Sequence, residues 1–378
     1  RPFALLFDAL AKTSPPVAFM MPERIAQTPP DRAIAEIVGS GPFQFLAGER
    51  VPGARNVYAK FDRYLPREGT VSSTAGPKVV HFERVEWQTI PDASTAAAAI
   101  QAGEIDAWEY PATDLLPLLR RNPNILVENP DPTGFIGILR FNQLTPPFND
   151  PALRRALLSA IVQEDFMRAV AGTDPSMWNA GIGFFPPASP MASTAGMEAL
   201  TGRRDLAAAR AALAPLAGQR VVLIGPADYP QVQALTEVAA DMLRRLGITL
   251  DYRPTDWATV LQSRANRGPV ERGGWNLFCT FLSGLDLMNP GVNFFLRGHG
   301  EAAFAGWPTS PTLEAMREEW LAAPDRDQQK AVAARIQQQA FQDVPCIPLG
   351  QFFQPTAWRR SVQGVLKGPT LFWNIRRA

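Results

Sequence analysis

The stretch FIGILRFNQLTPPFNDPALRRAL, residues 135–157, decides the fold class. Its first eight residues, 135–142, form an apolar and aromatic run that predicts a strand. Asp150 then stands in the N-cap position of a helix, and Pro151 stands in its first turn, where the missing N–H costs no hydrogen bond. A strand followed by a turn and a capped helix is the repeating unit of an α/β protein.

The same alternation continues on both sides of this stretch. Before it, we expect a strand at 79–87, a helix capped by Asp92 or Ser94 that stops at Gly103, a short strand at 103–108 and a helix near 112–121. After it, we expect a strand at 221–224, a helix at 229–246, a strand at 248–252, a helix near Trp257, and two helices that begin at Ser310–Pro311 and Pro324–Asp325. The chain is therefore predicted to be α/β along most of its length.

Size and composition limit the classes of protein that remain. The 378 residues exceed the roughly 250–300 at which single cores stop growing, so we expect two lobes. A proline-rich bend, residues 129–132, marks the predicted boundary between them. The 37 basic and 36 acidic side chains nearly cancel, which argues against nucleic acid as a partner. No apolar run approaches the roughly 18 residues of a membrane span.

Residues with obvious chemistry are few. The two histidines, His81 in a predicted strand and His299 in a predicted loop, lack a neighbouring nucleophile or a metal-ligand spacing, so no catalytic triad and no metal site is expected. No glycine-rich phosphate loop occurs, and no cofactor is predicted. Cys279 and Cys346 are expected to be buried thiols, with a disulfide between them as the alternative. Hydrolysis by carboxylates that meet only in space stays open as an alternative function.

One loop suggests ligand binding. Residues 273–290 read as a strand that runs into a glycine-containing turn with a single acidic side chain, Asp286. Ligands of α/β lobes gather beyond the carboxyl ends of strands, where a carboxylate could pair with a ligand ammonium. The alternative is that Asp286 only caps the turn before Pro290.

The order of several short motifs resembles the large solute-binding family of ABC importers that takes dipeptides, oligopeptides and nickel. In chain order they are VGSGPF (38–43), IPDAS (90–94) with GEID (103–106), RFN (140–142) with PPFND (146–150) and RRAL (154–157), DLAAAR (205–210) and FWN (372–374). The family carries a further segment before the part that resembles residues 1–42, so the chain resembles a form that lacks this N-terminal segment.

The resemblance implies a two-lobed periplasmic-binding-protein (Venus-flytrap) fold that encloses a ligand between lobes and delivers it, outside the cytoplasm, to a membrane permease. By similarity, residues 1–132 and 357–378 form lobe one, and residues 133–356 form lobe two. The expected function is capture without catalysis, by a monomer that closes on a small peptide-like or amino-bearing ligand. A hydrolase, or a sensory or scaffold protein of the same fold, are the alternatives.

The resemblance also implies which residues meet the ligand. Asp286 occupies the place of the family's aspartate that pairs with a peptide's amino terminus. Ser283 replaces the aromatic residue that peptide binders place three residues earlier, and the loop at 226–229 lacks the arginine of dipeptide binders, so a simple dipeptide fits less well. Backbone groups and wall residues complete the expected site: Gly134, Phe135, Tyr229, Trp275, Phe281, Gly284 and Gln351. Trp257 and Trp373 are expected to lie in the core.

Overall fold

A computed structural model describes residues 5–12, 17–29, 32–202 and 204–378. The chain divides into two compact units, each described separately below. The large unit contains Thr133–Phe353 and residues 5–9, and the small unit contains Leu10–Pro132 and Gln354–Ala378. The chain therefore passes between units at 9/10, at 132/133 and again at 353/354, the last of these three residues before the predicted return at 357. The assignment of residues 5–9 to the large unit differs from the prediction, and residues 1–4 lie outside the described part.

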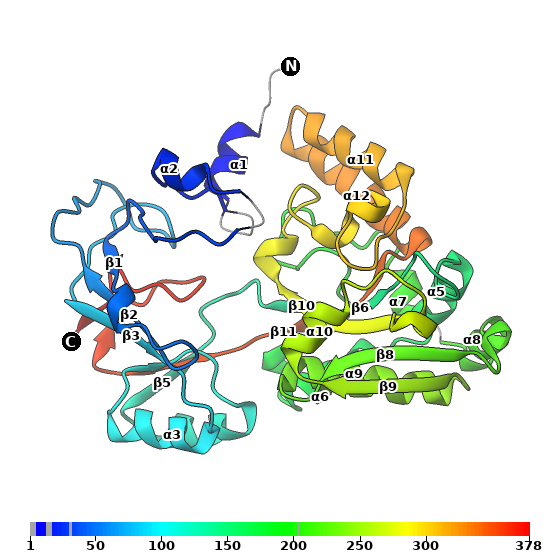
Figure 1. The fold of residues 1–378 in the computed structure, drawn as a ribbon, viewed down its shortest axis with the longest axis horizontal. Coiled ribbons are helices and arrows are strands. Elements are labelled where there is room, and N and C mark those ends of the chain that lie inside the picture. The colour runs from blue at the N-terminus through cyan, green and yellow to red at the C-terminus, as the bar shows by residue number, and fades with distance from the viewer. Residues whose placement is uncertain (1–4, 13–16, 30–31, 203) are drawn as a thin grey trace. The chain divides into compact units, whose positions relative to one another are not determined.

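A six-stranded mixed sheet forms the centre of the large unit (Figure 1). Its strands, in spatial order, are β7 (Trp178–Asn179), β11 (Cys346–Phe352), β6 (Phe135–Phe141), β10 (Leu277–Ser283), β8 (Arg220–Pro226) and β9 (Thr249–Thr255). The strands β6 and β11 are almost completely buried, as expected for central strands covered on both faces. β8 pairs in parallel with β9 and β10, whereas β6 runs antiparallel to both of its neighbours.

Helices cover both faces of this sheet. On one face, α6 (Gln163–Ala171) and α9 (Pro230–Arg245) pack closely enough that a side chain at Gly137 or Gly350 would collide with Leu235 or Met167. On the other face, α10 (Trp257–Ser263) contributes Val260 to a core that also holds Val222, Ile224, Trp275, Phe278 and Trp307. The alternation of side chains along β8 thus supplies both cores.

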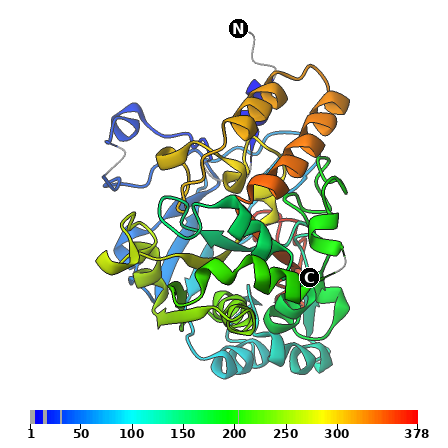
Figure 2. The ribbon, with the colours of Figure 1, turned by 90° about the vertical axis from the view of Figure 1, so that its right-hand side faces the viewer.

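Two long helices stand between β10 and β11 in the chain and lie side by side in both views (Figures 1 and 2). α11 (Pro311–Ala322) is capped by Ser310, whose Oγ accepts from Leu313 N, and α12 (Arg326–Asp343) is capped by Asp325. The remaining helices of this unit are α5 (Pro151–Leu158), α7 (Glu198–Thr201) and α8 (Leu206–Ala212). The predicted cap Asp150 is confirmed, because capping depends on residues that are neighbours in sequence. The helix predicted to open at Pro324–Asp325 begins there, with Asp325 as its cap.

The small unit is built around three small antiparallel sheets. They comprise β1 (Phe43–Phe45), β2 (Arg55–Lys60) and β3 (Arg84–Gln88); β4 (Ala107–Trp108), β12 (Thr356–Arg359) and β5 (Ile125–Glu128); and β13 (Val362–Gln363) with β14 (Arg376–Arg377). The helices are α2 (Glu23–Ala26), α3 (Ala93–Ala102) and α4 (Leu116–Arg121), and α1 (Leu6–Ala11) straddles the division between units. α3 is capped by Asp92 and stops at Gly103 in the left-handed region (φ 84°), as predicted.

Two sequence predictions need correction here. The strand expected at 79–87 is formed only over Arg84–Gln88, so His81 is an exposed residue outside any strand. The possible disulfide is wrong: both cysteines are free and buried. Cys279 pairs with Leu139 and Cys346 with Arg140, so the two thiols lie on strands at opposite edges of β6, too far apart to bridge. Burial raises their pKa values to about 12 and about 11, which makes them inert.

None of the helices among the described residues combines the length and the apolar character needed to cross a membrane.

Candidate ligand-binding site

The candidate site begins where β10 ends. Ser283 closes the strand, and its Oγ accepts a hydrogen bond from Leu285 N (3.3 Å) at the start of a short 3₁₀ turn, Gly284–Leu287. Glycine is required at 284, because a Cβ there would lie 2.2 Å from the carbonyl oxygen of Thr133. The Gly284 N–H donates to Gly134 O (2.7 Å), which fixes the start of the turn against the chain that leads into β6.

Asp286 lies in this turn and is only 7% exposed. Its Oδ1 is buried and has no hydrogen-bond partner among the described residues. Burial raises the pKa of this carboxyl from 3.8 to about 6, so it is mostly ionised at neutral pH. An ionised acceptor without a donor is a costly group to bury, and it is suited to a cation that arrives with a ligand.

Aromatic rings gather at the same edge of the sheet. The antiparallel register places Phe135, the first residue of β6, opposite Ser283 on one side and Phe352 on the other. Phe281 contacts the rings of Phe135 (5.3 Å between centroids), Phe352 (5.2 Å) and Tyr229 (5.6 Å). Phe135, Phe281 and Tyr229 are half-buried, so they expose apolar surface, whereas Phe352 lies beneath them.

The position of Tyr229 follows from the parallel pair of β8 and β9. Tyr229 is the residue before α9, just beyond the carboxyl end of β8, where ligands of α/β sheets bind. Its ring packs edge-on against Trp257 (5.4 Å), and burial raises the pKa of its hydroxyl, so the phenol stays neutral. The Asp228 carboxylate beside it accepts from Trp257 N (2.7 Å).

This arrangement fits binding. A buried carboxylate whose Oδ1 has no partner among the described residues, and half-exposed aromatic rings at the end of the same strand, suit a ligand with a cationic and an apolar part. Among the described residues, no group of three or more histidine, cysteine, aspartate or glutamate side chains is placed to hold a metal ion.

Comparison with known proteins places the chain in a family. Residues 1–282 match the model of the bacterial extracellular solute-binding proteins, family 5. The probable peptide ABC transporter periplasmic-binding protein y4tO of Sinorhizobium fredii is 32% identical over 383 aligned residues, which cover all of this chain and 71% of that protein. The chain belongs to family 5 of the bacterial extracellular solute-binding proteins.

Solved structures agree in fold. The Helicobacter pylori binding protein DppA, in complex with the peptide STSA, aligns over 90% of this chain with a TM-score of 0.71 and 19% identity. The Agrobacterium protein AgaA, in complex with agropinic acid, aligns over 94% with a TM-score of 0.72 and 17% identity. The chain spans 63% of the DppA chain and 70% of the AgaA chain. The family 5 fold predicted from the motifs is therefore confirmed.

Four of the predicted site residues of this solute-binding protein come together around the aromatic cluster: Phe135, Tyr229, Phe281 and Ser283. Asp286 follows Ser283 by three residues, in the turn that Ser283 begins. The alternative role of Asp286, capping the turn before Pro290, is not seen at its Oδ1, which has no partner among the described residues. Asn289 Oδ1 accepts from Gly291 N (2.9 Å) in the turn that contains Pro290.

Two of the predicted contact residues are buried within the fold. Trp275 is fully buried in the core between β8 and α10, and its indole N–H donates to Arg264 O (3.2 Å). Gln351 is also buried, and its amide donates to Thr133 O (2.7 Å) and accepts from Asn179 (2.8 Å). At the two predicted glycines, the Gly284 N–H and the Gly134 carbonyl bond to one another. Ligand contacts by other backbone groups at Gly134 and Gly284 stay a prediction.

Phe352 was not predicted as part of the site. Its sequence context, the end of a buried strand, gave no sign of a site. The signal lies in strand pairing, since only the register of β11 with β6 brings it to Phe135, with the rings stacked at 5.6 Å.

Proposed function

We propose that this family 5 protein captures a small peptide-like or amino-bearing ligand outside the cytoplasm and delivers it to the permease of an ABC importer. In the proposal, Asp286 pairs with the ligand's ammonium group, and the rings of Phe135, Phe281 and Tyr229 contact its apolar part. The protein binds the ligand and releases it to the permease chemically unchanged.

The observation that carries the proposal is that, within the part of the chain that the structure describes, the Oδ1 of Asp286 has no hydrogen-bond partner. A buried carboxylate without a donor loses the hydrogen bonds it makes in water, and a ligand ammonium would restore them as charge-assisted bonds. The relatives support the same class of ligand, because y4tO is named as a probable peptide ABC transporter periplasmic-binding protein and DppA was solved with a peptide.

The surroundings of Tyr229 bear on the other end of the ligand. Asp228 is the charged residue in the loop between β8 and α9, and its carboxylate is committed to Trp257 N. A ligand carboxylate would meet repulsion there instead of a basic side chain. The proposal therefore favours amino-bearing ligands whose acid group is distant from this loop, blocked or absent, such as longer peptides, amidated peptides or opine-like compounds.

A thermal-shift screen with matched ligand pairs tests the proposal. Each compound, from dipeptides to tetrapeptides, peptide amides, opines and polyamines, is measured in its free-amino form and after N-acetylation. At a hundredfold excess over the dissociation constant a ligand adds about 2.7 kcal/mol of stability, which gives a clear shift. We expect stabilisation by free-amino compounds that is lost on acetylation.

Two variants make the screen specific. Asp286→Asn removes the proposed charge partner and should abolish the difference between free and acetylated ligands. Asp251→Asn is the matched control, because Asp251 lies in the same unit but is already paired with Arg253 (2.8 Å). Equal binding of free and acetylated compounds, or turnover of any of them, would contradict the proposal.

A further inference from the structure

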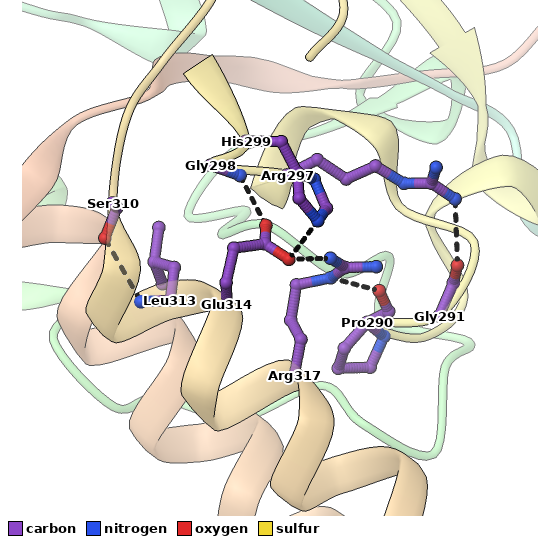
Figure 3. A network of polar contacts seen from close by, with 9 residues as sticks. All are labelled: Pro290, Gly291, Arg297, Gly298, His299, Ser310, Leu313, Glu314 and Arg317. Atoms are coloured by element: carbon purple, nitrogen blue, oxygen red, sulfur yellow. Dashed lines mark hydrogen bonds and ion pairs between the residues drawn. The ribbon is translucent and has the colours of Figure 1, made fainter. Parts of the chain in front are cut away.

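The chain after Asp286 is attached to helix α11 by an arginine. Arg317 is 7% exposed, and its Nε donates to the carbonyl of Pro290 (3.0 Å), four residues beyond Asp286 (Figure 3). The Nη1 of the same guanidinium donates to the Glu314 carboxylate one turn earlier on α11 (2.6 Å). The fork geometry of arginine lets one side chain hold both partners at once.

Glu314 extends this attachment to the far end of the loop. Its Oε1 accepts from the backbone N–H of Gly298 (2.5 Å), and its Oε2 is shared by Arg317 and His299 Nε2 (2.8 Å). Figure 3 shows these contacts converging on the one carboxylate from the loop on one side and from the helix on the other. The two ends of the segment 290–298 are therefore tied to one turn of α11.

Direct packing reinforces the same contact. A side chain at Gly291 would lie 3.3 Å from the ring of Trp320 and 3.9 Å from Leu321, both on α11, so the loop backbone rests on the helix. Nearer to Asp286, the Ser189 hydroxyl donates to the carbonyl of Met288 (2.5 Å).

These anchors answer an energetic question that Asp286 raises. A loop free to move would turn its carboxylate toward water, because burying an ionised group without a donor costs free energy. Asp286 stays buried although its Oδ1 has no partner among the described residues, so other contacts of the loop must hold it there.

We propose that Arg317 and Glu314 are positioning residues, which hold the loop after Asp286 on α11 and so keep the Asp286 carboxylate buried and ready for a cationic ligand. The role of the carboxylate as ligand partner rests on the proposed function, whereas the positioning of the carboxylate does not.

The first test needs no ligand. Protein labelled with ¹³C-carboxyl aspartate is titrated by NMR, with the Asp286 signal identified from its absence in Asp286→Asn. In the unaltered chain we expect a pKa near the value of about 6 that burial imposes. Arg317→Gln should lower it toward the ordinary 3.8, and hydrogen exchange of the amides at 284–291 should accelerate about tenfold or more, because the loop opens locally.

Matched variants separate positioning from general damage. Arg335→Gln breaks the ion pair between Arg335 and Glu319, which involves the same pair of helices but not the loop, and should change neither readout. Glu314→Gln is the second variant if Arg317→Gln fails to fold, and it should move both readouts in the same direction. Arg317→Lys keeps the charge but loses the fork, so it should restore the readouts only in part. An Asp286 pKa and exchange rates unchanged in both Arg317→Gln and Glu314→Gln would overturn the proposal.

A binding measurement tests whether the two positioning residues, Arg317 and Glu314, affect the ligand through Asp286. Thermal stabilisation by a tryptic casein hydrolysate, free and acetylated, is compared in Arg317→Gln, in Asp286→Asn and in the double variant that carries both substitutions. Arg317→Gln alone should reduce the stabilisation that the free hydrolysate gives. When Asp286→Asn is already present, adding Arg317→Gln should cause no further reduction. Full additivity would overturn a role through Asp286. If Asp286→Asn itself leaves stabilisation unchanged, the proposed ligand contact fails while the NMR result still decides the positioning.

Discussion

Two buried charges in the large unit have opposite environments. Arg140, on β6, is completely buried, and its guanidinium donates to the carbonyls of Ala305 (2.8 Å), Pro345 (3.0 Å) and Phe304 (3.3 Å). Asp286, beyond the end of the neighbouring strand β10, is nearly as buried, yet its Oδ1 has no partner among the described residues. The guanidinium of Arg140 is thus surrounded by acceptors, whereas the Oδ1 of Asp286 has no donor in the described part of the chain.

The difference separates a charge that is paired within the fold from one that the proposed function pairs with a ligand. The carbonyls around Arg140 belong to loops that the arginine joins to the sheet, and the rings of Phe295 and Phe304 lie near its guanidinium (5.6 and 5.7 Å). Such a charge stabilises the fold only while all of its partners remain. A buried charged group with an atom that lacks a donor instead costs stability, and under the proposed function the ligand's ammonium removes that cost. The following predictions test whether this contrast holds.

Replacing Arg140 should have the largest effect. Arg140→Met keeps the volume but leaves several buried carbonyls without donors, so we expect a loss of about 3–5 kcal/mol in the free energy of unfolding. Urea denaturation followed by tryptophan fluorescence measures it. A loss below about 1 kcal/mol would mean that the carbonyls find other donors, and the contrast with Asp286 would fail.

Ligand binding at Asp286 should depend on pH. Below a pKa of about 6 the free carboxyl is protonated and cannot pair with an ammonium, so the dissociation constant of a free-amino ligand should rise about thirtyfold from pH 7 to pH 4.5. Calorimetric titration at both values measures the change. The N-acetylated ligand is the control and should show little dependence. A flat profile for the free-amino ligand would remove Asp286 from the site.

Asp286→Asn should stabilise the empty protein. The carboxyl pKa is raised by folding, so protonated Asp286 stabilises the fold fully below pH 3.8, and that contribution is lost as pH rises through about 6. The neutral amide has no such loss. We therefore expect a gain of about 1–2 kcal/mol in unfolding free energy at pH 7.5 and little change at pH 3.5. Denaturation of the variant and the unaltered chain at both pH values decides it, and destabilisation at pH 7.5 would show that the carboxylate has a structural partner.

Features of the fold and the candidate site could be predicted from sequence when the residues that interact are neighbours along the chain. Asp150 was predicted as a cap, and Asp92 as one of two candidates with Ser94, because a cap bonds to a backbone N–H only two or three residues away. Asp286 was proposed as a ligand contact because a lone acid in a glycine-containing turn after a strand matched a family pattern, and that role stays a prediction. Its burial and its lack of a partner required the structure.

The errors have one physical cause. Trp275 and Gln351 were expected at the site because they flank strands, but which way a side chain points depends on which face another element covers. Trp275 points toward α10 and Trp307, and the amide of Gln351 meets Thr133, more than 200 positions earlier. Phe352 was missed for the same reason. Pairing between distant strands decides these positions, and local pattern does not encode it.

The smallest effect is expected where a charge is both exposed and paired. Glu164 and Arg168 form an ion pair one turn apart on α6 (2.5 Å), with each side chain about half exposed. Solvent solvates either charge when its partner is removed, so Glu164→Gln should cost less than about 0.5 kcal/mol at any salt concentration. The same denaturation assay measures it beside Arg140→Met and Asp286→Asn. A loss of unfolding free energy as large as that of Arg140→Met would mean that an ion pair stabilises the protein to the same extent whether it is exposed or buried. A negligible loss would leave burial and the supply of partners as the two quantities that distinguish Arg140 from Asp286.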